Sequence, residues 1–229
     1  MQKPIVTVII PAFNEEQSIG KVIAAIPKNV VDHTIVVSNT STDNTFEVAR
    51  QAGAIVLEEK RKGYGWACLL GVEKANKLNT EIVVFLDGDY SDYPEEIPDV
   101  IAPILKNDVD LVIGSRVLGK REKGSLTPQQ IFGNWLATKL ILLFYRAKFT
   151  DLGPFRAMKI NSLNALEMAD KTYGWTIEMQ IKAVKKKMKF VEVPVNYKKR
   201  IGVSKVSGTV KGTIMAGIKI ISAVFKYLF

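Results

Sequence analysis

Short apolar runs alternate with helix-like segments through the first half of the chain. Each run has the length of a strand and is rich in β-branched residues: 5–11, 33–38, 54–58, 81–87 and 109–115. Continuous apolar runs are typical of strands buried on both faces of a parallel sheet. The segments between them carry apolar residues at helical spacing: 15–26, 42–53, 65–76 and 94–106. We place Asn14 ahead of the first helix, with Gln17 in a capping-box position.

The second half of the chain has a different pattern. Residues 127–148 predict an apolar, aromatic-rich helix, and residues 151–160 predict a loop with a short strand. A second helix follows over 174–189, then a strand over 190–197, and residues 207–229 again have helical spacing, with lysines opposite a broad apolar arc. Strand–helix alternation predicts a doubly wound α/β fold with a mostly parallel sheet, here extended by C-terminal amphipathic helices.

Composition narrows the classes of partner. The net charge is +9, from 32 Lys and Arg against 23 Asp and Glu, which suits nucleic acid, acidic lipid or a phosphate-bearing substrate. The single cysteine, Cys68, excludes an internal disulfide and fits a reducing compartment. The N-terminal residues run straight into the first strand, so we expect no signal peptide. No uncharged apolar run reaches about 18 residues, so we expect no transmembrane helix.

An acidic cluster follows the fourth apolar run. Asp87, Gly88 and Asp89 come at its end, and Asp92 lies three residues further on. Carboxylates so close together repel one another unless a cation lies between them, and hard cations such as Mg²⁺ or Mn²⁺ prefer oxygen ligands. An isolated pair of this kind also occurs in simple turns. Its place at the carboxyl end of a strand, where α/β sheets bind ligands, favours a metal site.

Several segments, taken in order, resemble glycosyltransferase family 2, and most closely its dolichyl-phosphate mannose/glucose synthase-like branch: VIIPAFNEEQSI, IVVSNTSTDNT, RKGYGWACLLG, FLDGDYSDYPEE, IGSR, DLGPFRAM and YGWTIEMQIKA. The resemblance implies a GT-A fold, a nucleotide-diphosphate sugar of the UDP-glucose or GDP-mannose type, a bound Mg²⁺ or Mn²⁺, and inversion at the anomeric carbon. It divides one domain, 1–229, into a nucleotide-binding half (1–116), an acceptor half (117–205) and an amphipathic interfacial helix (206–229).

The resemblance also implies roles for individual residues. The metal ligands would be Asp87 and Asp89, beside Gly88. Contacts to the donor would come from Pro11, Ala12, Asn14, Glu15, Asn39, Lys62, Gly63, Arg156, Glu178 and Arg200. The catalytic set would be Asp89, Arg116, Asp151 and Lys205. Arg116 and Lys205 would stabilise the leaving diphosphate, whereas Asp151 is either a general base or an orienting residue.

The chain departs from the family pattern in three places. Asn39 stands where the family usually has an acidic residue that contacts the base, so the identity of the base stays open. Ser91 and Asp92 replace the usual Gln and His after the acidic motif, so the surroundings of the metal differ. Gly153-Pro154 replaces the usual Ser-Gly pair, and proline stiffens that turn.

The two amphipathic helices bear on the acceptor. They are either core or dimer-contact helices, or helices that lie on a membrane with aromatic anchors, for which the candidates are Trp135, Phe144, Tyr145, Phe225, Tyr227 and Phe229. The resemblance favours the membrane, because the synthase branch has interface helices in matching places.

We therefore expect a cytoplasmic enzyme, peripheral on the inner face of a membrane, that transfers a hexose to a polyprenyl phosphate. A lipid or saccharide hydroxyl is the alternative acceptor, and the oligomeric state, including a homo-oligomer, stays open. A rival class is a non-catalytic module that binds nucleotide sugars or nucleic acid. We expect no nucleic-acid partner, because the chain contains no recognised nucleic-acid motif.

Overall fold

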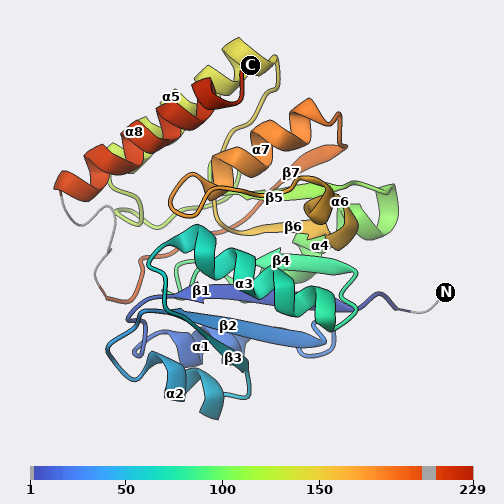
Figure 1. Ribbon diagram of the computed structural model, residues 1–229, viewed down its shortest axis with the longest axis vertical. Helices are drawn as coiled ribbons and strands as arrows, with labels where there is room; N and C mark the ends of the chain where they lie inside the picture. Colours follow the sequence, from blue (N-terminus) through green and yellow to red (C-terminus); the bar gives the residue numbers. More distant parts are fainter. Residues whose placement is uncertain (1–2, 203–209, 229) are drawn as a thin grey trace.

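A single mixed sheet of seven strands forms the centre of the molecule (Figure 1). The computed structural model describes residues 3–202 and 210–228, with the backbone alone at 210–216 and 220. The strand order is β3-β2-β1-β4-β6-β5-β7. β6 is antiparallel to its neighbours β4 and β5, and the other pairs are parallel. The strands are β1 (Val6–Ala12), β2 (His33–Asn39), β3 (Ile55–Glu59), β4 (Ile82–Phe85), β5 (Leu111–Ser115), β6 (Arg156–Lys159) and β7 (Phe190–Pro194).

Helices cover both faces of the sheet and give two separate apolar cores (Figure 1). One face carries α1 (Ile19–Ala25), α2 (Thr45–Gln51) and α4 (Ile97–Asn107), the last preceded by a 3₁₀ turn, η1 (Pro94–Glu96). The other carries α3 (Tyr64–Lys77), α5 (Pro128–Tyr145), α6 (Ile160–Ala165), α7 (Trp175–Lys185) and α8 (Val210–Lys226). The central strands β1, β4 and β5 are buried along their whole length, as the apolar runs predict.

The start of the first helix differs from the prediction. α1 begins at Ile19 with Ser18 in the N-cap position, so the prediction that Asn14 and Gln17 flank its start is wrong. Asn14 instead has a left-handed backbone, with φ 54°, and its side-chain oxygen accepts the N–H of Thr42 at 2.8 Å. A polar side chain that binds a neighbouring loop competes with helix formation. The helix therefore starts a full turn later than its apolar spacing suggests.

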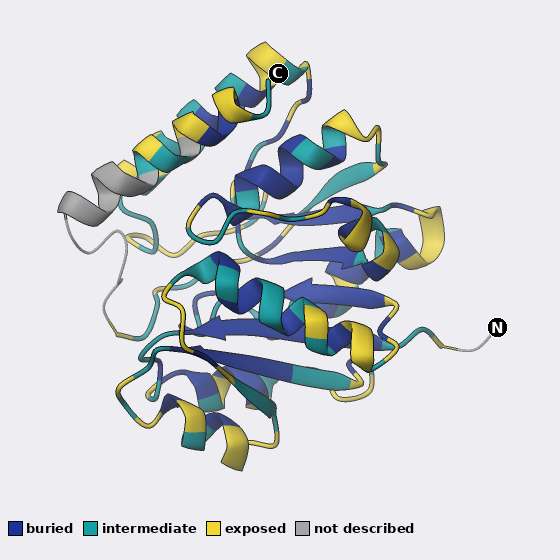
Figure 2. Ribbon diagram, in the orientation of Figure 1, coloured by how far each residue is buried: buried dark blue, intermediate teal, exposed yellow. Residues whose placement is uncertain are grey.

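α5 and α8 lie side by side at one end of the molecule (Figure 1). α5 begins with a capping box between Thr127 and Gln130, and the hydroxyl of Tyr145 donates to the carbonyl of Val224 on α8. Both helices carry exposed residues (Figure 2), and several of these are large and apolar. We call this set the α5/α8 apolar face: Ile131, Phe132, Trp135, Leu142, Leu143, Phe144, Ile218, Ile221 and Phe225.

Among the described residues, no helix is both long enough and apolar enough to cross a membrane. α8 is apolar on two sides. Ala223 and Val224 are buried in the core, whereas Ile218 and Phe225 are 55% and 47% exposed. The apolar arc predicted for the C-terminal segment is therefore divided between the protein core and the surface.

Candidate active site

A cleft opens where the strands β1, β2 and β4 end. Its volume is about 180 Å³, and it contains most of the residues predicted to bind a nucleotide sugar: Pro11, Ala12, Glu15, Asn39, Lys62, Gly63, Asp87, Gly88, Asp89 and Arg200. The remaining lining residues are Phe13, Tyr64, Ala67 and Tyr173, which the sequence did not single out. Phe13 and Tyr64 directly adjoin predicted site residues, and Tyr173 opens the YGWTIEM segment. Their proximity in sequence was the available signal.

Two carboxylates of the acidic cluster, Asp87 and Asp89, line this cleft. Burial raises the pKa of Asp87 to about 7, and the charge of Asp89 acts in the same direction. Burial and the charge of Asp87 likewise raise the pKa of Asp92 well above its usual range. Asp92 Oδ2 accepts the backbone N–H of Asp87 at 3.5 Å, whereas its Oδ1 is buried without a hydrogen-bond partner. The positive charge around Asp87 and Asp92 therefore does not offset their burial and mutual repulsion.

The donor set around Asp87 and Asp89 fits a hard cation. The described part of the chain contains no group of three His, Cys, Asp or Glu side chains arranged to hold a metal. Mg²⁺ in phosphate-transferring sites is usually held by one or two carboxylates, with substrate phosphates and water supplying the other ligands. Asp87 and Asp89, two carboxylates that line the same cleft, match that pattern. Ser91, whose N–H donates to Asp89 Oδ1 at 3.0 Å, holds one of them in place.

Arg200 lines the cleft beside Asp89. One of its terminal nitrogens is 3.1 Å from Asp89 Oδ2, and the other donates to Glu15 Oε1 at 3.0 Å. Its side chain remains 26% exposed. The backbone beside it is fixed, because the N–H of Ile201 donates to the carbonyl of Asp89 at 2.9 Å. Arg200 therefore joins the start of α1 to the acidic cluster.

A second arginine and aspartate pair, Arg116 and Asp151, lies deeper. Arg116 donates through Nε to Oδ2 at 2.8 Å and through a terminal nitrogen to Oδ1 at 2.7 Å, and its backbone N–H donates to Oδ2 at 2.7 Å. Asp151 is 1% exposed. Burial raises the pKa of Asp151, but the charge and hydrogen bonds of Arg116 outweigh burial and leave the pKa below 3.8. With both oxygens engaged, this geometry favours the orienting role for Asp151.

Arg156 and Glu178 do not line the cleft. Arg156 is fully buried and donates to the carbonyl oxygens of Leu152, Gly153 and Thr176. Glu178 is also fully buried, with its carboxylate directed at backbone N–H groups and at α8. Both positions support the loops around the cleft from behind. Their predicted contact with the donor stays a prediction.

Asn39 organises one wall of the cleft. Its Nδ2 donates to the carbonyls of Glu59 and Arg61 at 3.1 and 2.8 Å, and its Oδ1 accepts the N–H of Gly63 at 2.8 Å. An amide has both a donor and an acceptor, whereas a carboxylate at this position would lack the donor. Asn39 thereby fixes the loop that carries Lys62, whose ammonium lies 5.4 Å from the centre of the Phe13 ring. Lys205 lies outside the described residues.

The family model for glycosyl transferase family 2 matches residues 7–166 of the chain. The chain belongs to this family. Family membership confirms the predicted enzyme class and overturns the rival of a non-catalytic binding module. An uncharacterised glycosyltransferase of Mycobacterium tuberculosis is 36% identical over 215 residues, which are 92% of this chain and 94% of that one.

Other relatives of this glycosyltransferase support the predicted branch. A UDP-N-acetylglucosamine–dolichyl-phosphate N-acetylglucosaminyltransferase of Methanococcus voltae is 28% identical, covering 85% of this chain and 86% of that one. An undecaprenyl-phosphate mannosyltransferase of Micrococcus luteus is 27% identical, covering 93% and 92%.

Solved structures confirm the GT-A fold. Glucosyl-3-phosphoglycerate synthase of Mycobacterium tuberculosis, in complex with Mn²⁺, UDP-glucose and phosphoglyceric acid, superposes with a TM-score of 0.78 at 21% identity. The match covers 98% of this chain and 80% of that one. The same enzyme has also been solved with Mg²⁺ and UDP.

Proposed function

We propose that this glycosyltransferase moves a hexose, with inversion, from a nucleotide-diphosphate sugar to a polyprenyl phosphate at the inner surface of a membrane. The observation that carries the proposal is the cleft at the carboxyl ends of β1, β2 and β4, which is lined by the two acidic residues Asp87 and Asp89 and by Arg200. Relatives named for transfer to dolichyl and undecaprenyl phosphate support the choice of acceptor.

The donor fits the cleft by charge. Pro11, Ala12 and Asn39 line the part nearest to β1 and β2, where the base and ribose would lie. The diphosphate would then lie toward Asp87 and Asp89, which would hold Mg²⁺ or Mn²⁺. That cation would offset the negative charge that the diphosphate gains as it leaves the sugar. Lys62 and Arg200 supply further positive charge from the chain itself, so the leaving group is stabilised from two sides.

The contacts of Asp151 bear on whether the acceptor is a hydroxyl or a phosphate. An acceptor hydroxyl needs a general base to remove its proton, whereas a phosphate already carries negative charge. Asp151 was the candidate base, and Arg116 engages both of its oxygens. A phosphate acceptor needs no such base. This contact supports a phosphate over a hydroxyl.

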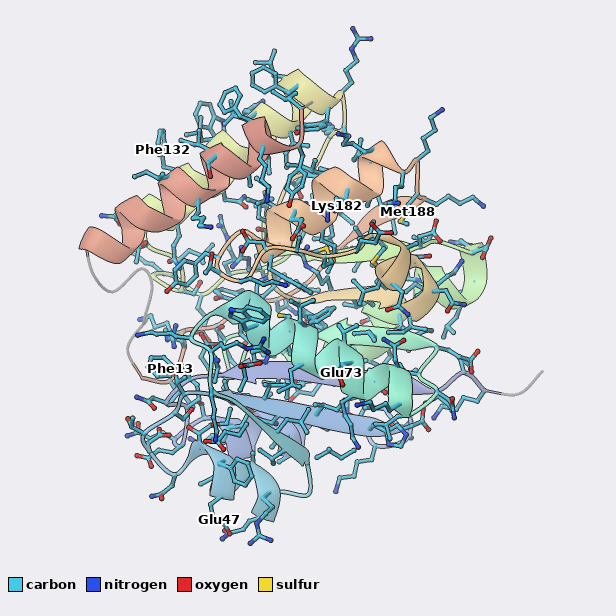
Figure 3. The ribbon with its side chains drawn as sticks, viewed as in Figure 1. Phe13, Glu47, Glu73, Phe132, Lys182 and Met188 are labelled. Carbon is cyan, nitrogen blue, oxygen red and sulfur yellow. The ribbon has the colours of Figure 1, made fainter. Side chains whose placement is uncertain are left out.

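The α5/α8 apolar face supports a lipid-linked acceptor. It contains Trp135, 53% exposed, and Leu143, 70% exposed, and Figure 3 shows Phe132 on the outer side of α5. Aromatic and aliphatic side chains on a helix favour the boundary between headgroups and acyl chains. The polyprenyl chain of an acceptor lies in the same layer. An enzyme held there would meet the phosphate at the membrane surface.

A transfer assay tests both parts of the proposal. Radiolabelled nucleotide sugars are incubated with the protein, Mn²⁺ or Mg²⁺, and polyprenyl phosphate in anionic liposomes, and label is followed into the organic phase. Asp89→Asn should lower transfer about 10²- to 10³-fold, by analogy with loss of other electrostatic groups that stabilise a transition state. Asp99→Asn, at an exposed position on α4, is the matched control and should retain activity.

A second pair of variants tests the membrane surface. Trp135→Ser should reduce transfer to the liposome acceptor while leaving nucleotide binding intact. Phe46→Ser, at an exposed phenylalanine on α2, should leave both intact. Label that enters the organic phase equally well with Asp89→Asn would contradict the proposed chemistry. Equal transfer by the Trp135 and Phe46 variants would contradict the membrane surface.

A further inference from the structure

The loop between α6 and α7 forms a wall of the cleft. Its Tyr173 lines the cleft directly. The carbonyl of Lys171 accepts the N–H of Trp66 at 3.2 Å, in the first turn of α3. Gly63 and Gly65 permit this packing, because a Cβ at either position would collide with the carbonyl of Lys171 or Asp170. The position of residues 169–174 therefore fixes the cleft at the start of α3.

Glu178 holds this loop from behind. One carboxylate oxygen accepts the N–H of Ala169 at 2.9 Å, and the other accepts the N–H of Asp170 at 2.7 Å. Asp170 in turn accepts the N–H groups of Thr172 and Gly174 at 2.7 and 3.1 Å. Hydrogen bonds to a buried carboxylate are among the stronger ones in proteins. The loop thus depends on one buried side chain of α7.

The C-terminal helix reaches the same two carboxylates. The hydroxyl of Tyr227, just past the end of α8, donates to Glu178 Oε1 at 2.7 Å. The ammonium of Lys219, on α8, is 3.8 Å from Asp170 Oδ2. The ammonium of Lys182, which Figure 3 labels on α7, lies 2.7 Å from Glu178 Oε1. Lys219 on α8 and Tyr227 just past its end therefore contact the carboxylates that shape the loop.

We infer that Tyr227 and Glu178 are positioning residues through which α8 sets the affinity of the cleft for nucleotide. The inference rests on the proposed function in that the cleft is taken to bind the nucleotide part of the donor. α8 also contributes Ile218, Ile221 and Phe225 to the α5/α8 apolar face. The membrane surface proposed above to bind that face therefore acts on the donor site through Tyr227. Because coupling between two sites is reciprocal, nucleotide in the cleft also changes the affinity of α8 for that surface.

Nucleotide binding and amide exchange test the link. Binding of UDP and of GDP, each with Mn²⁺, is measured by calorimetry for the full chain, well below its melting temperature. Tyr227→Phe should weaken binding about fivefold, at the lower end of typical coupling between sites. Glu178→Gln should weaken it more, because its NH₂ group would face an N–H donor. In both variants the amides of residues 169–174 should exchange faster without ligand, and the donor KM should rise with kcat little changed.

Tyr145→Phe is the matched control. It removes a hydroxyl that also ties α8 to the body, through the carbonyl of Val224, but that does not touch Glu178. It should leave nucleotide affinity and loop exchange unchanged. Equal weakening by the Tyr145 and Tyr227 variants would mean general loosening of α8 and would overturn the inference. So would unchanged affinity and exchange in Tyr227→Phe. If the wild-type protein binds neither nucleotide, the proposed function fails, whereas the exchange comparison still decides the link.

Discussion

Two arginine and aspartate pairs lie in or beside the cleft, and they are built differently. Arg116 and Asp151 form three hydrogen bonds, and Asp151 is almost fully buried. Arg200 makes one contact to Asp89 and one to Glu15, with a quarter of its side chain exposed. In the first pair, which we call the closed pair, Arg116 binds both oxygens of Asp151. The second shares its charge among groups that face an open cleft.

Because of this difference, the contact between Arg116 and Asp151 is suited to stay intact during the reaction, whereas the contact between Arg200 and Asp89 can be replaced by a ligand. Breaking a buried pair leaves an uncompensated charge in the protein interior, whereas a partly exposed pair loses little, because water replaces the contact. Arg116 and Asp151 are therefore suited to hold geometry constant through the reaction. Arg200 can leave Asp89 when a cation or diphosphate arrives.

The largest change in the free energy of unfolding should come from breaking the contact between Arg116 and Asp151. Asp151→Asn leaves Arg116 buried without a counter-charge, and it should reduce the free energy of unfolding by about 3 kcal/mol. Arg200→Gln should reduce it by less than Asp151→Asn does, because 26% of the Arg200 side chain is exposed and water replaces part of the lost contact. Urea unfolding of the two variants and the wild type measures both. Equal losses would show that the two pairs do not differ as described.

A smaller effect should appear in metal binding. Arg200 competes with a cation for Asp89, so Arg200→Gln should strengthen binding of Mn²⁺ alone by about two- to fivefold, as expected for loss of a partly exposed pair. Titration calorimetry without nucleotide measures the affinity. Arg50→Gln, in the exposed pair with Glu47 on α2, is the control and should have no effect. Weaker Mn²⁺ binding in the Arg200 variant would refute competition.

The smallest effect concerns pH. The pKa of Asp151 is lowered in the folded protein, so its contribution to stability is present above the ordinary value of 3.8 and is lost as pH falls through the lower folded value. The stability gap between wild type and Asp151→Asn should therefore narrow as the pH falls below 3.8. Urea unfolding of both proteins at neutral and acidic pH tests the sign. A gap that stays constant would mean that Asp151 keeps its charge throughout.

Much of the fold was predictable because buried strands appear in the sequence as continuous apolar runs. The strands predicted over 33–38 and 109–115 are observed as His33–Asn39 and Leu111–Ser115. The antiparallel placement of β6 was not predictable, since its side-chain pattern is the same in either direction. Helix α6 was also missed, because six residues carry too little periodic signal.

Residues of the candidate site were predictable from the sequence where they directly follow a strand. Asn39 and Asp87 follow apolar runs, and parallel strands bring their carboxyl ends to one edge. The side chains of Arg156 and Glu178, for which the family resemblance implies contact with the donor, bind backbone groups of the interior, and the sequence did not predict these contacts. Charge alone does not tell whether a side chain faces a cleft or supports it. That distinction depends on packing that only the folded chain reveals.

The place of β6 constrains how this enzyme can be altered. The strand comes from the second half of the chain, yet it lies between β4 and β5, both from the first half. A fragment that ends at residue 116 would lose the strand that joins its two parts, so the halves cannot be exchanged between relatives as separate modules. A change of acceptor preference has to come instead from substitutions on α5, α8 and the connecting loops, within an intact sheet.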